Sequence, residues 1–478
     1  MANSRKSRSL NKFGEAEIAF ERALEKIQAR VSILTNEKQT SFAVAYSGGL
    51  DSSVLLHLAC RYAKSKGLKV HAFHIHHGLS PNADAWLEHC RAEAEQQGAI
   101  FSSVKAKIDS RSIVKDGVEQ AARIARYATL RDLSRLNDIH LLLAAHHRDD
   151  QAETLMLQLM RGAGLPGLSG MAALQEEHAL LGKGISLGRP LLEVGRAALE
   201  RYADRHSLSF VTDESNQDAS FRRNALRQIV FPLLEEHFPG FSSCVARSAS
   251  HIRSAQCLLE DVAESDLGKC RDTIENQAAV NLDELAKLSP LRRDNVLRHW
   301  LNGLAVQMPS TARLEELRLQ FLDSQPDRHP LFELGQVALS RLGQYLILHP
   351  NPGNPPTEEI LLQWQGQDTI PVPQWHGTLL FERVEQNGIA AEALFEKPIA
   401  IRARGGRERL KIASNRPSRT LKNLFQEAGI PVWRREWLPL VYLQQDLIFA
   451  GGLGMDVRHC SSGGGIALSW RPDWQSTS

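Results

Sequence analysis

The chain has 478 residues, of which 42% are hydrophobic and 23% are charged, a composition typical of a soluble globular protein with about three domains. The formal net charge of +2 excludes a uniformly basic nucleic-acid-binding protein, so any such surface must be local. The sequence has no long apolar run, which predicts no membrane segment, and the basic residues 1–13 lack the apolar core of a signal peptide. The six cysteines form no C-x-x-C pair, which predicts reduced thiols, and together these features predict a cytoplasmic protein.

The first part of the chain alternates between helix-like and strand-like segments. A leading helix is predicted because four apolar residues fall on one face, namely Phe20, Leu24, Ile27 and Val31. Strands are predicted at 42–46, 68–77, 99–108 and 140–147, and helices from about 52 and at 82–98, 118–136 and 149–162. This alternation predicts an α/β fold with a doubly wound parallel sheet that helices cover on both faces.

The rest of the chain predicts further domains. A mainly helical domain is predicted at 224–350, with helical periodicity to about 325 and short strand-like runs at 330–350. A stretch rich in Pro, Gly and Asn after it predicts a linker at 351–370. Residues 371–478 mix strands with a short helix and predict a small α+β domain. We therefore expect an N-terminal extension with a helix at 1–36 and a catalytic domain at 37–223, followed by these two domains.

Polar clusters follow three of the predicted strands, at the carboxyl ends where parallel sheets bind ligands. The clusters are SGGLDS at 47–52, His76 with His77, and HHRDD at 146–150. The first is one residue away from the G-x-S-x-G turn that holds the nucleophile of a serine hydrolase. That interpretation of Ser47 also needs an acid and a histidine, and no sequence feature ties either to this serine.

A phosphate-binding turn explains more of the first cluster. Gly48 and Gly49 let backbone N–H groups approach an anion closely, and the following helix contributes its N-terminal amides. Ser47 and Ser52 add hydroxyl donors. Asp51 would repel a phosphate, unless a magnesium ion lies between them. The alternative without a ligand is an ordinary capped turn between a strand and a helix.

The third cluster places Asp150 and Glu153 three residues apart at a helix start, and hence on one face. Such a pair can hold an ammonium group or a metal, or it can simply complement the helix dipole. The paired histidines favour hydrogen bonding over a zinc site. The G-x-G-x-x-G string at 162–167 follows a helix and contains Pro166, which favours a loop closing the site over a dinucleotide-binding turn.

Residues 401–440 hold ten Lys or Arg against three Asp or Glu, with two tryptophans among them. A solvated charged face is the usual explanation of such a run. An arginine-rich run in an otherwise nearly neutral chain favours a surface for nucleic-acid phosphates instead. The residues predicted to bind are Arg402, Arg404, Arg407, Arg419, Lys422, Arg434 and Arg435.

Several strings together resemble one known family. SGGLDSS is similar to the loop of the N-type ATP pyrophosphatases (the PP-loop superfamily), which have an adenine-nucleotide alpha-hydrolase-like fold. The strings HIHHGLS, AHHRDDQAETLMLQLMRGAGLPGLSGM, RPLLEV, DESNQDASFRRNALR, TLKNLFQEAGIPVWRREWLPLVY and GGLGMDV resemble the bacterial-type tRNA(Ile)-lysidine synthases. The resemblance covers most of the chain between Ser47 and Val457.

The resemblance implies a ligase that forms a C–N bond on the wobble cytidine of the isoleucine tRNA with a CAU anticodon. ATP would adenylate the cytosine carbonyl with loss of pyrophosphate, and free L-lysine would then displace AMP. The implied ATP-binding residues are Ser47, Gly48, Gly49, Leu50, Asp51 and Ser52. Asp51 would also lie near Mg²⁺, while Asp150, Glu153 and Arg223 would bind lysine and, with Asp51, form the catalytic set.

Related enzymes with the same loop are less well supported. A tRNA 2-thiolation enzyme would need paired cysteines, and amide-forming synthetases of the NAD or GMP type would not explain the basic C-terminal region. The alternative from a different class is the α/β serine hydrolase with Ser47 as nucleophile. The sequence leaves the oligomeric state open, a homodimer included.

Overall fold

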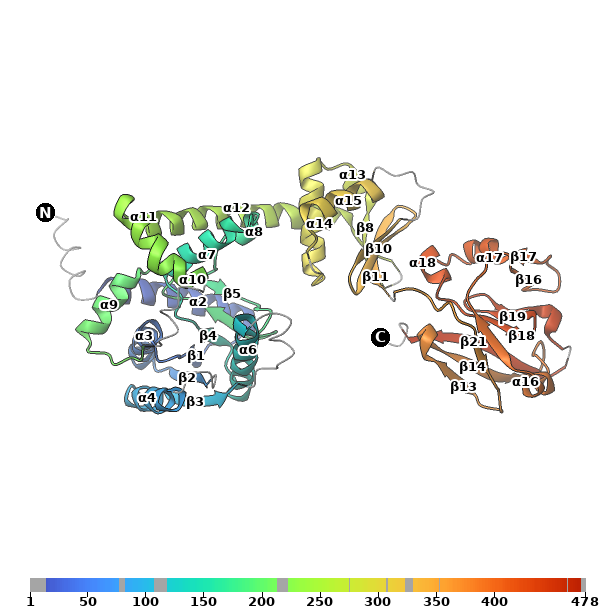
Figure 1. Ribbon diagram of the computed structural model, residues 1–478, viewed down its shortest axis with the longest axis horizontal. Helices are drawn as coiled ribbons and strands as arrows, with labels where there is room; N and C mark the ends of the chain where they lie inside the picture. Colours follow the sequence, from blue (N-terminus) through green and yellow to red (C-terminus); the bar gives the residue numbers. More distant parts are fainter. Residues whose placement is uncertain are drawn as a thin grey trace. The chain divides into compact units, whose positions relative to one another are not determined.

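The computed structural model describes residues 14–76, 82–106, 118–212, 222–274, 276–306, 308–322, 330–351, 353–461 and 463–473. The chain divides into two compact units, Met1–Leu258 and Leu259–Ser478 (Figure 1). In the described ranges, no helix combines the length and the apolar character needed to cross a membrane.

The first unit is built on a six-stranded sheet in the order β3-β2-β1-β4-β6-β5. All neighbouring strands are parallel except β5 and β6, which confirms the predicted α/β fold. The strands are β1 (Ser41–Ala45), β2 (Lys69–His76), β3 (Ile100–Lys105), β4 (Leu141–Leu143), β5 (Leu174–Gln175) and β6 (Ser186–Gly188). Because β1 lies at the centre of the sheet, its carboxyl end faces β2 on one side and β4 on the other.

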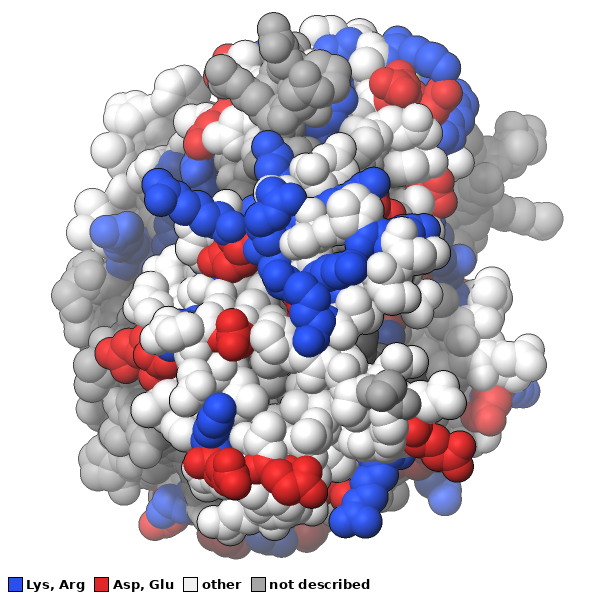
Figure 2. Space-filling view, turned by 90° about the vertical axis from the view of Figure 1, so that its right-hand side faces the viewer, with Lys and Arg blue, Asp and Glu red and all other residues white. Residues whose placement is uncertain are grey.

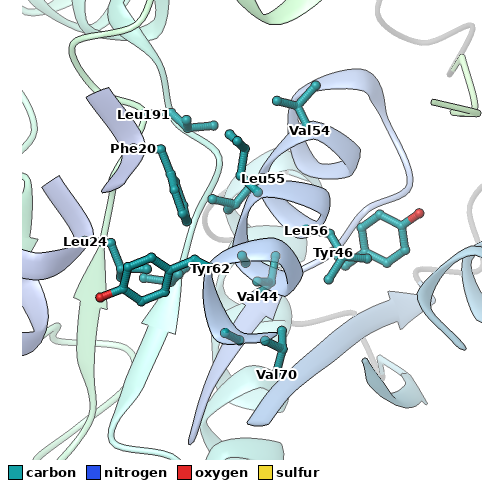
Figure 3. Packing of buried hydrophobic residues seen from close by; sticks show 14 of the residues in the cluster. Phe20, Leu24, Val44, Tyr46, Val54, Leu55, Leu56, Tyr62, Val70 and Leu191 are labelled. Atoms are coloured by element: carbon teal, nitrogen blue, oxygen red, sulfur yellow. The ribbon is translucent and has the colours of Figure 1, made fainter. Parts of the chain in front are cut away.

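Helices cover both faces of this sheet, as predicted from the alternation. The helices in this part of the chain are α2 (Glu15–Thr35), α3 (Leu50–Lys66), α4 (Ala83–Gln96), α6 (Val118–Leu136), α7 (Arg148–Met160), α8 (Leu165–Leu168), α9 (Arg196–Arg205), α10 (Arg222–Ala225), the π-helix η2 (Leu226–Val230), α11 (Phe231–His237) and α12 (Phe241–Cys270), whose residues continue past Leu258 into the second unit. Successive residues of β1 point to opposite faces, so Val44 packs with α2 and α3, while Ala43 packs with α6. Figure 3 shows the first of these cores, where Phe20 and Leu24 of α2 lie near Tyr62 of α3.

The second unit begins with a region of helices and one antiparallel sheet. The helices are α13 (Leu282–Ala286), α14 (Pro290–Gly303) and α15 (Thr311–Phe321). The sheet has the order β7-β8-β11-β10-β9, with β7 (Arg271–Ile274), β8 (Gln277–Asn281), β9 (Leu331–Leu334), β10 (Val337–Leu342) and β11 (Tyr345–Pro350). Helical periodicity did not predict β7 and β8, because these strands are short and carry many polar residues.

The C-terminal part of the second unit holds three small sheets. The strands are β12 (Ile360–Leu362), β13 (Thr369–Val372), β14 (Gly377–Val384), β15 (Ile399–Arg402), β16 (Arg409–Leu410), β17 (Arg419–Thr420), β18 (Leu440–Leu443), β19 (Asp446–Ala450), β20 (Gly454–Met455) and β21 (Gly465–Pro472). The helices are η3 (Pro373–Trp375), α16 (Ala391–Glu396), α17 (Leu421–Glu427), α18 (Val432–Arg435) and η4 (Val457–His459). Within the expected linker 351–370, β12 pairs with β15, so the part without strands is shorter than expected.

The packing of α2 on the sheet gives a test of this fold. Phe20 is fully buried and its ring lies edge-on to Tyr62, with 6.3 Å between ring centroids. Phe20→Ala is expected to destabilise the first unit by roughly 3–5 kcal/mol, because it leaves a cavity in the core. Chemical denaturation followed by circular dichroism measures this loss. The control is Ile33→Ala on the same helix, where the side chain is 70% exposed; an equal loss for both variants would contradict this packing.

Candidate active site

The turn between β1 and α3 carries the first polar cluster. Gly48 has a φ of +85°, and a Cβ added to it would lie 2.5 Å from Sγ of Cys90, so this position requires glycine. The hydroxyl of Ser52 donates to the carbonyl of Gly49 at 2.9 Å and lies 3.0 Å from Oγ of Ser47. The glycines and hydroxyls therefore surround the N-terminus of α3, as a phosphate-binding turn requires. Among the described residues, no histidine hydrogen-bonds to Ser47, as a serine nucleophile would need.

Asp51 lies in the first turn of α3 and faces two cations. Its Oδ2 is 3.7 Å from Nε2 of His147 and 3.7 Å from Nη1 of Arg196. Its Oδ1 is buried and makes no hydrogen bond to any described residue. A buried carboxylate oxygen without a donor suits a magnesium ion that takes its other ligands from phosphate and water. Within the described ranges, no three His, Cys, Asp or Glu side chains gather into a metal site.

His147 joins this loop to the third polar cluster. It is fully buried at the N-cap of α7, where its Nδ1 lies 3.2 Å from the amide nitrogen of Asp149 and 3.5 Å from Oδ2 of the same residue. Its Nε2 lies 3.4 Å from Oδ2 of Asp150, and 3.7 Å from Asp51. Burial opposes a charge on this ring, but the surrounding carboxylates, first Asp149 and then Asp51, raise the pKa of His147 to about 10. One imidazole therefore lies between the two predicted sets of site residues.

Asp150 and Glu153 lie in the first two turns of α7, and two arginines contact them. Arg223 donates from Nε to Glu153 at 2.6 Å and from Nη2 to Asp150 at 3.4 Å. Arg227 makes the same pair of contacts, at 2.7 Å and 3.2 Å. Only 1% of Glu153 is exposed. Burial alone would raise the pKa of Asp150, but the positive neighbours, His147 first, hold it below its usual value.

The structure thus brings together Asp51, Asp150, Glu153 and Arg223, which the sequence predicted, with residues that the sequence analysis missed. Arg227 lies four residues after Arg223, a helical spacing that could have indicated a second contact with the carboxylates. The position of Arg196 beside Asp51 had no local signal, because it depends on the packing of α9. His76 hydrogen-bonds to Asp84 at 3.0 Å, while His77 and residues 213–221 lie outside the described residues.

The predicted basic residues of the C-terminal region lie in the second unit. Arg402 pairs with Glu359 at 2.9 Å, and Arg419 pairs with Glu427. Arg404 lies over the ring of Phe425, and Arg435 donates to the carbonyl of Ile430. The other predicted residues are Arg407, Lys422 and Arg434. Figure 2 shows Lys and Arg side chains gathered on one face of the chain.

Comparisons with known proteins relate the whole chain to one activity. Residues 19–234 match the PP-loop domain, residues 281–346 the TilS substrate binding domain and residues 399–470 the TilS substrate C-terminal domain. A tRNA(Ile)-lysidine synthase from Ralstonia nicotianae is 38% identical over 465 residues, covering 95% of this chain and 98% of that protein. The enzyme of the same name from Pectobacterium atrosepticum is 39% identical over 414 residues, covering 86% of this chain and 90% of that protein. Among solved structures, the U34-tRNA thiolase NcsA from Methanococcus maripaludis is 17% identical with a TM-score of 0.39, covering 49% of this chain and 80% of that one.

The geometry of Gly48 gives a test of the loop. Gly48→Ala is expected to weaken ATP binding about tenfold or more, because the added Cβ meets Cys90 and the positive φ strains an alanine. Equilibrium binding of a non-hydrolysable ATP analogue measures the change. The control is Gly67→Ala at the end of α3, where φ is +68° but nothing lies within 4 Å of the new Cβ. An unchanged ATP affinity in Gly48→Ala would show that this turn does not bind the nucleotide.

Proposed function

The chain belongs to the tRNA(Ile)-lysidine synthase family and forms lysidine on isoleucine tRNA, and we propose how its residues divide this reaction between them. The substrates are ATP, free L-lysine and the wobble cytidine of the CAU anticodon. Because the substrate is tRNA, the enzyme works in the cytoplasm. The arrangement of Asp51, His147 and Asp150, with 3.4–3.7 Å between successive charged groups, supports the proposal most directly, because the turn that we propose to bind ATP lies beside the carboxylates that we propose to bind lysine.

The turn between β1 and α3 binds ATP. Residues 47–52 supply the hydroxyl groups of Ser47 and Ser52 and the amides at the start of α3, while Gly48, Gly49 and Leu50 bring the backbone close to the phosphates. Asp51 holds Mg²⁺ through the oxygen that has no other partner. When bound, the ion neutralises charge that develops on the departing pyrophosphate.

Asp150 and Glu153 bind the ammonium group of lysine, together with Arg223. Two carboxylates face two guanidinium groups here, and the His147 ring lies 3.4 Å from one of the carboxylates, Asp150. An incoming ammonium group adds positive charge beside both guanidinium groups, so one of them must turn toward another anion. The adenylated cytidine provides one, which makes Arg223, the more exposed of the two arginines, suited to contact the intermediate.

The reaction then has two displacements. The carbonyl oxygen of cytosine attacks the α-phosphorus of ATP, and the bond to the bridging oxygen breaks to release pyrophosphate. The side-chain amine of lysine attacks the ring carbon that carries the adenylate, the C–O bond breaks, and AMP leaves. The amine loses a proton as the C–N bond forms, and Asp150 is the carboxylate placed beside it to pass that proton on to water. The cations around Asp150 hold its pKa below its usual value, so it does not keep the proton. The protein needs no nucleophile of its own.

We further propose that the domains have separate tasks, with residues 37–223 catalytic and the basic region of 371–478 binding tRNA. The residues of this region expected to contact phosphates are Arg402, Arg404, Arg407, Arg419, Lys422, Arg434 and Arg435. The anticodon loop offers the unstacked base that the first unit modifies.

The lysine site is tested by removing one charge at a time. Asp150→Asn is expected to raise KM for lysine roughly 100-fold, because it removes a charge-assisted contact to the ammonium group. Glu153→Gln is expected to have at least this effect, since it also releases Arg223 and Arg227. The measurement is incorporation of radiolabelled lysine into unmodified tRNA with a CAU anticodon, with ATP present.

The control for these variants is Asp132→Asn, an exposed carboxylate on α6 that pairs only with its neighbour Arg131 in the described structure. ATP affinity should stay unchanged in all three variants. If Asp150→Asn and Glu153→Gln keep the lysine KM of the native protein, these carboxylates do not bind lysine and this part of the proposal fails.

The basic region is tested by salt dependence. Arg407 and Lys422 form no ion pair with any described residue, so each has a charge available for a phosphate. Arg407→Gln and Lys422→Gln are each expected to weaken tRNA binding and to reduce the slope of log K against log salt by about one. The matched control is Arg30→Gln, an exposed arginine outside the basic region that pairs with Glu176 and should leave the slope unchanged. Equal slopes in native and variant proteins would exclude Arg407 and Lys422 as phosphate contacts.

A further inference from the structure

Three arginines near the carboxyl ends of β4 and β6 form a group that the proposed reaction does not use. Arg123 and Arg126 lie in the first half of α6, the helix that precedes β4 in the chain. Arg189 directly follows β6. We call these three residues the arginine cluster. The cluster is electrostatically close to the lysine site, because groups from both act on His146. Burial lowers the pKa of this ring, Asp150 raises it, and Arg189, Arg223 and Arg126 lower it.

Two stacked rings support the cluster. Tyr127 is buried, and its ring is stacked on His178 with 4.4 Å between centroids and 17° between planes. The guanidinium carbons of Arg123 and Arg126 lie 5.0 Å and 5.6 Å from the centre of the Tyr127 ring. One aromatic platform thus holds two guanidinium groups near each other, although they repel.

Arg189 is the most buried residue of the cluster and is only 4% exposed. Its Nη1 donates to the carbonyl of Ala172 at 2.9 Å and its Nη2 to Oε1 of Gln175 at 3.3 Å. Its Nε is buried and has no hydrogen-bond partner in the described structure. Burial lowers the pKa of Arg189, and Arg123 lowers it further. A buried guanidinium with an unused donor indicates a missing acceptor.

The cluster has no balancing acid among the described residues. No Asp or Glu in the described ranges forms an ion pair with Arg123, Arg126 or Arg189. The acids of the lysine site, Asp150 and Glu153, pair with Arg223 and Arg227 instead. Burial lowers the pKa of the adjacent His146 to about 3, and Arg189 is among the cations that keep this ring neutral. An anion bound here would relieve a repulsion that the fold maintains in its absence.

The position of the cluster indicates which anion it binds. The phosphates of ATP are expected after β1, and β4 separates β1 from β6 in the sheet. Free lysine has a single carboxylate, whereas an RNA strand has a phosphate on each side of every base. Arg126 is exposed and Arg123 is half-buried, so RNA can reach them, and guanidinium forks suit phosphate oxygens.

We propose that the arginine cluster binds the backbone phosphates that flank the target cytidine, and so fixes the flipped-out nucleotide between the ATP loop and the lysine site. This assignment rests on tRNA as the substrate, but not on the roles given to Asp150 and Glu153. Arg123 and Arg126 contact the phosphates from the surface. Arg189, which lies deeper, orients the nearest phosphate.

The first experiment measures tRNA binding by the full chain over a range of salt concentrations. Arg126→Gln is expected to weaken binding about tenfold at low salt and to reduce the salt slope by about one. The control is Arg135→Gln, an exposed residue on the last turn of the same helix, which removes the same charge outside the cluster. Arg123→Gln provides a second test if Arg126→Gln does not fold. Equal slopes for Arg126→Gln and Arg135→Gln would overturn the proposal.

The second experiment locates the contact. A full-length tRNA with a neutral methylphosphonate beside the target cytidine should bind the native protein about tenfold more weakly than unmodified tRNA does. The same methylphosphonate should weaken tRNA binding by Arg126→Gln much less. If the substitution and the methylphosphonate reduce tRNA affinity additively, Arg126 does not contact this phosphate. If Arg126→Gln instead raises KM for lysine but not for cadaverine, which lacks the carboxylate, the cluster binds the amino acid and the proposal is wrong. Native protein that forms no lysidine in the same buffer would count against the proposed function itself, not against the cluster.

Discussion

The buried carboxylate of Glu153 is the constraint on which the site depends. Arg223 and Arg227 both donate to it, so it ties the start of α7 to the helical segment formed by α10 and η2. Removing one partner from a buried ion pair costs roughly 3–5 kcal/mol, because the other charge is left unpaired. The packing of the start of α7 against α10 and η2 therefore depends on this carboxylate and on both arginines.

From β1 to β6, the carboxyl edge of the sheet carries alternating charge. Asp51 follows β1, the His147 ring and the acids of α7 follow β4, and Arg189 follows β6. The ligands that we propose, namely ATP with its metal, an ammonium group and an RNA phosphate, would meet complementary charges in this same order. Each proposed ligand therefore has its own binding groups along the edge of the sheet.

The sequence was sufficient for features that depend on neighbouring residues. The turn at Gly48, the first-turn acids of α7 and the alternation of strands and helices are local, so periodicity and turn chemistry predicted them. Arg227 is 74 residues away from Glu153, and the contact between Arg196 and Asp51 depends on how α9 packs. The strands β7 and β8 were missed because their residues, such as Arg271 and Gln277, lack an apolar alternation. Contacts of this kind arise from tertiary packing, which no local pattern encodes.

The thiol beneath Gly48 has a practical consequence for labelling. Burial raises the pKa of Cys90 to about 12, so the thiolate that reacts with maleimides or oxidants hardly forms at neutral pH. Cys244 and Cys257, by contrast, are both exposed on α12. A fluorophore attached through thiol chemistry will therefore report from α12, while the turn between β1 and α3 keeps its native packing.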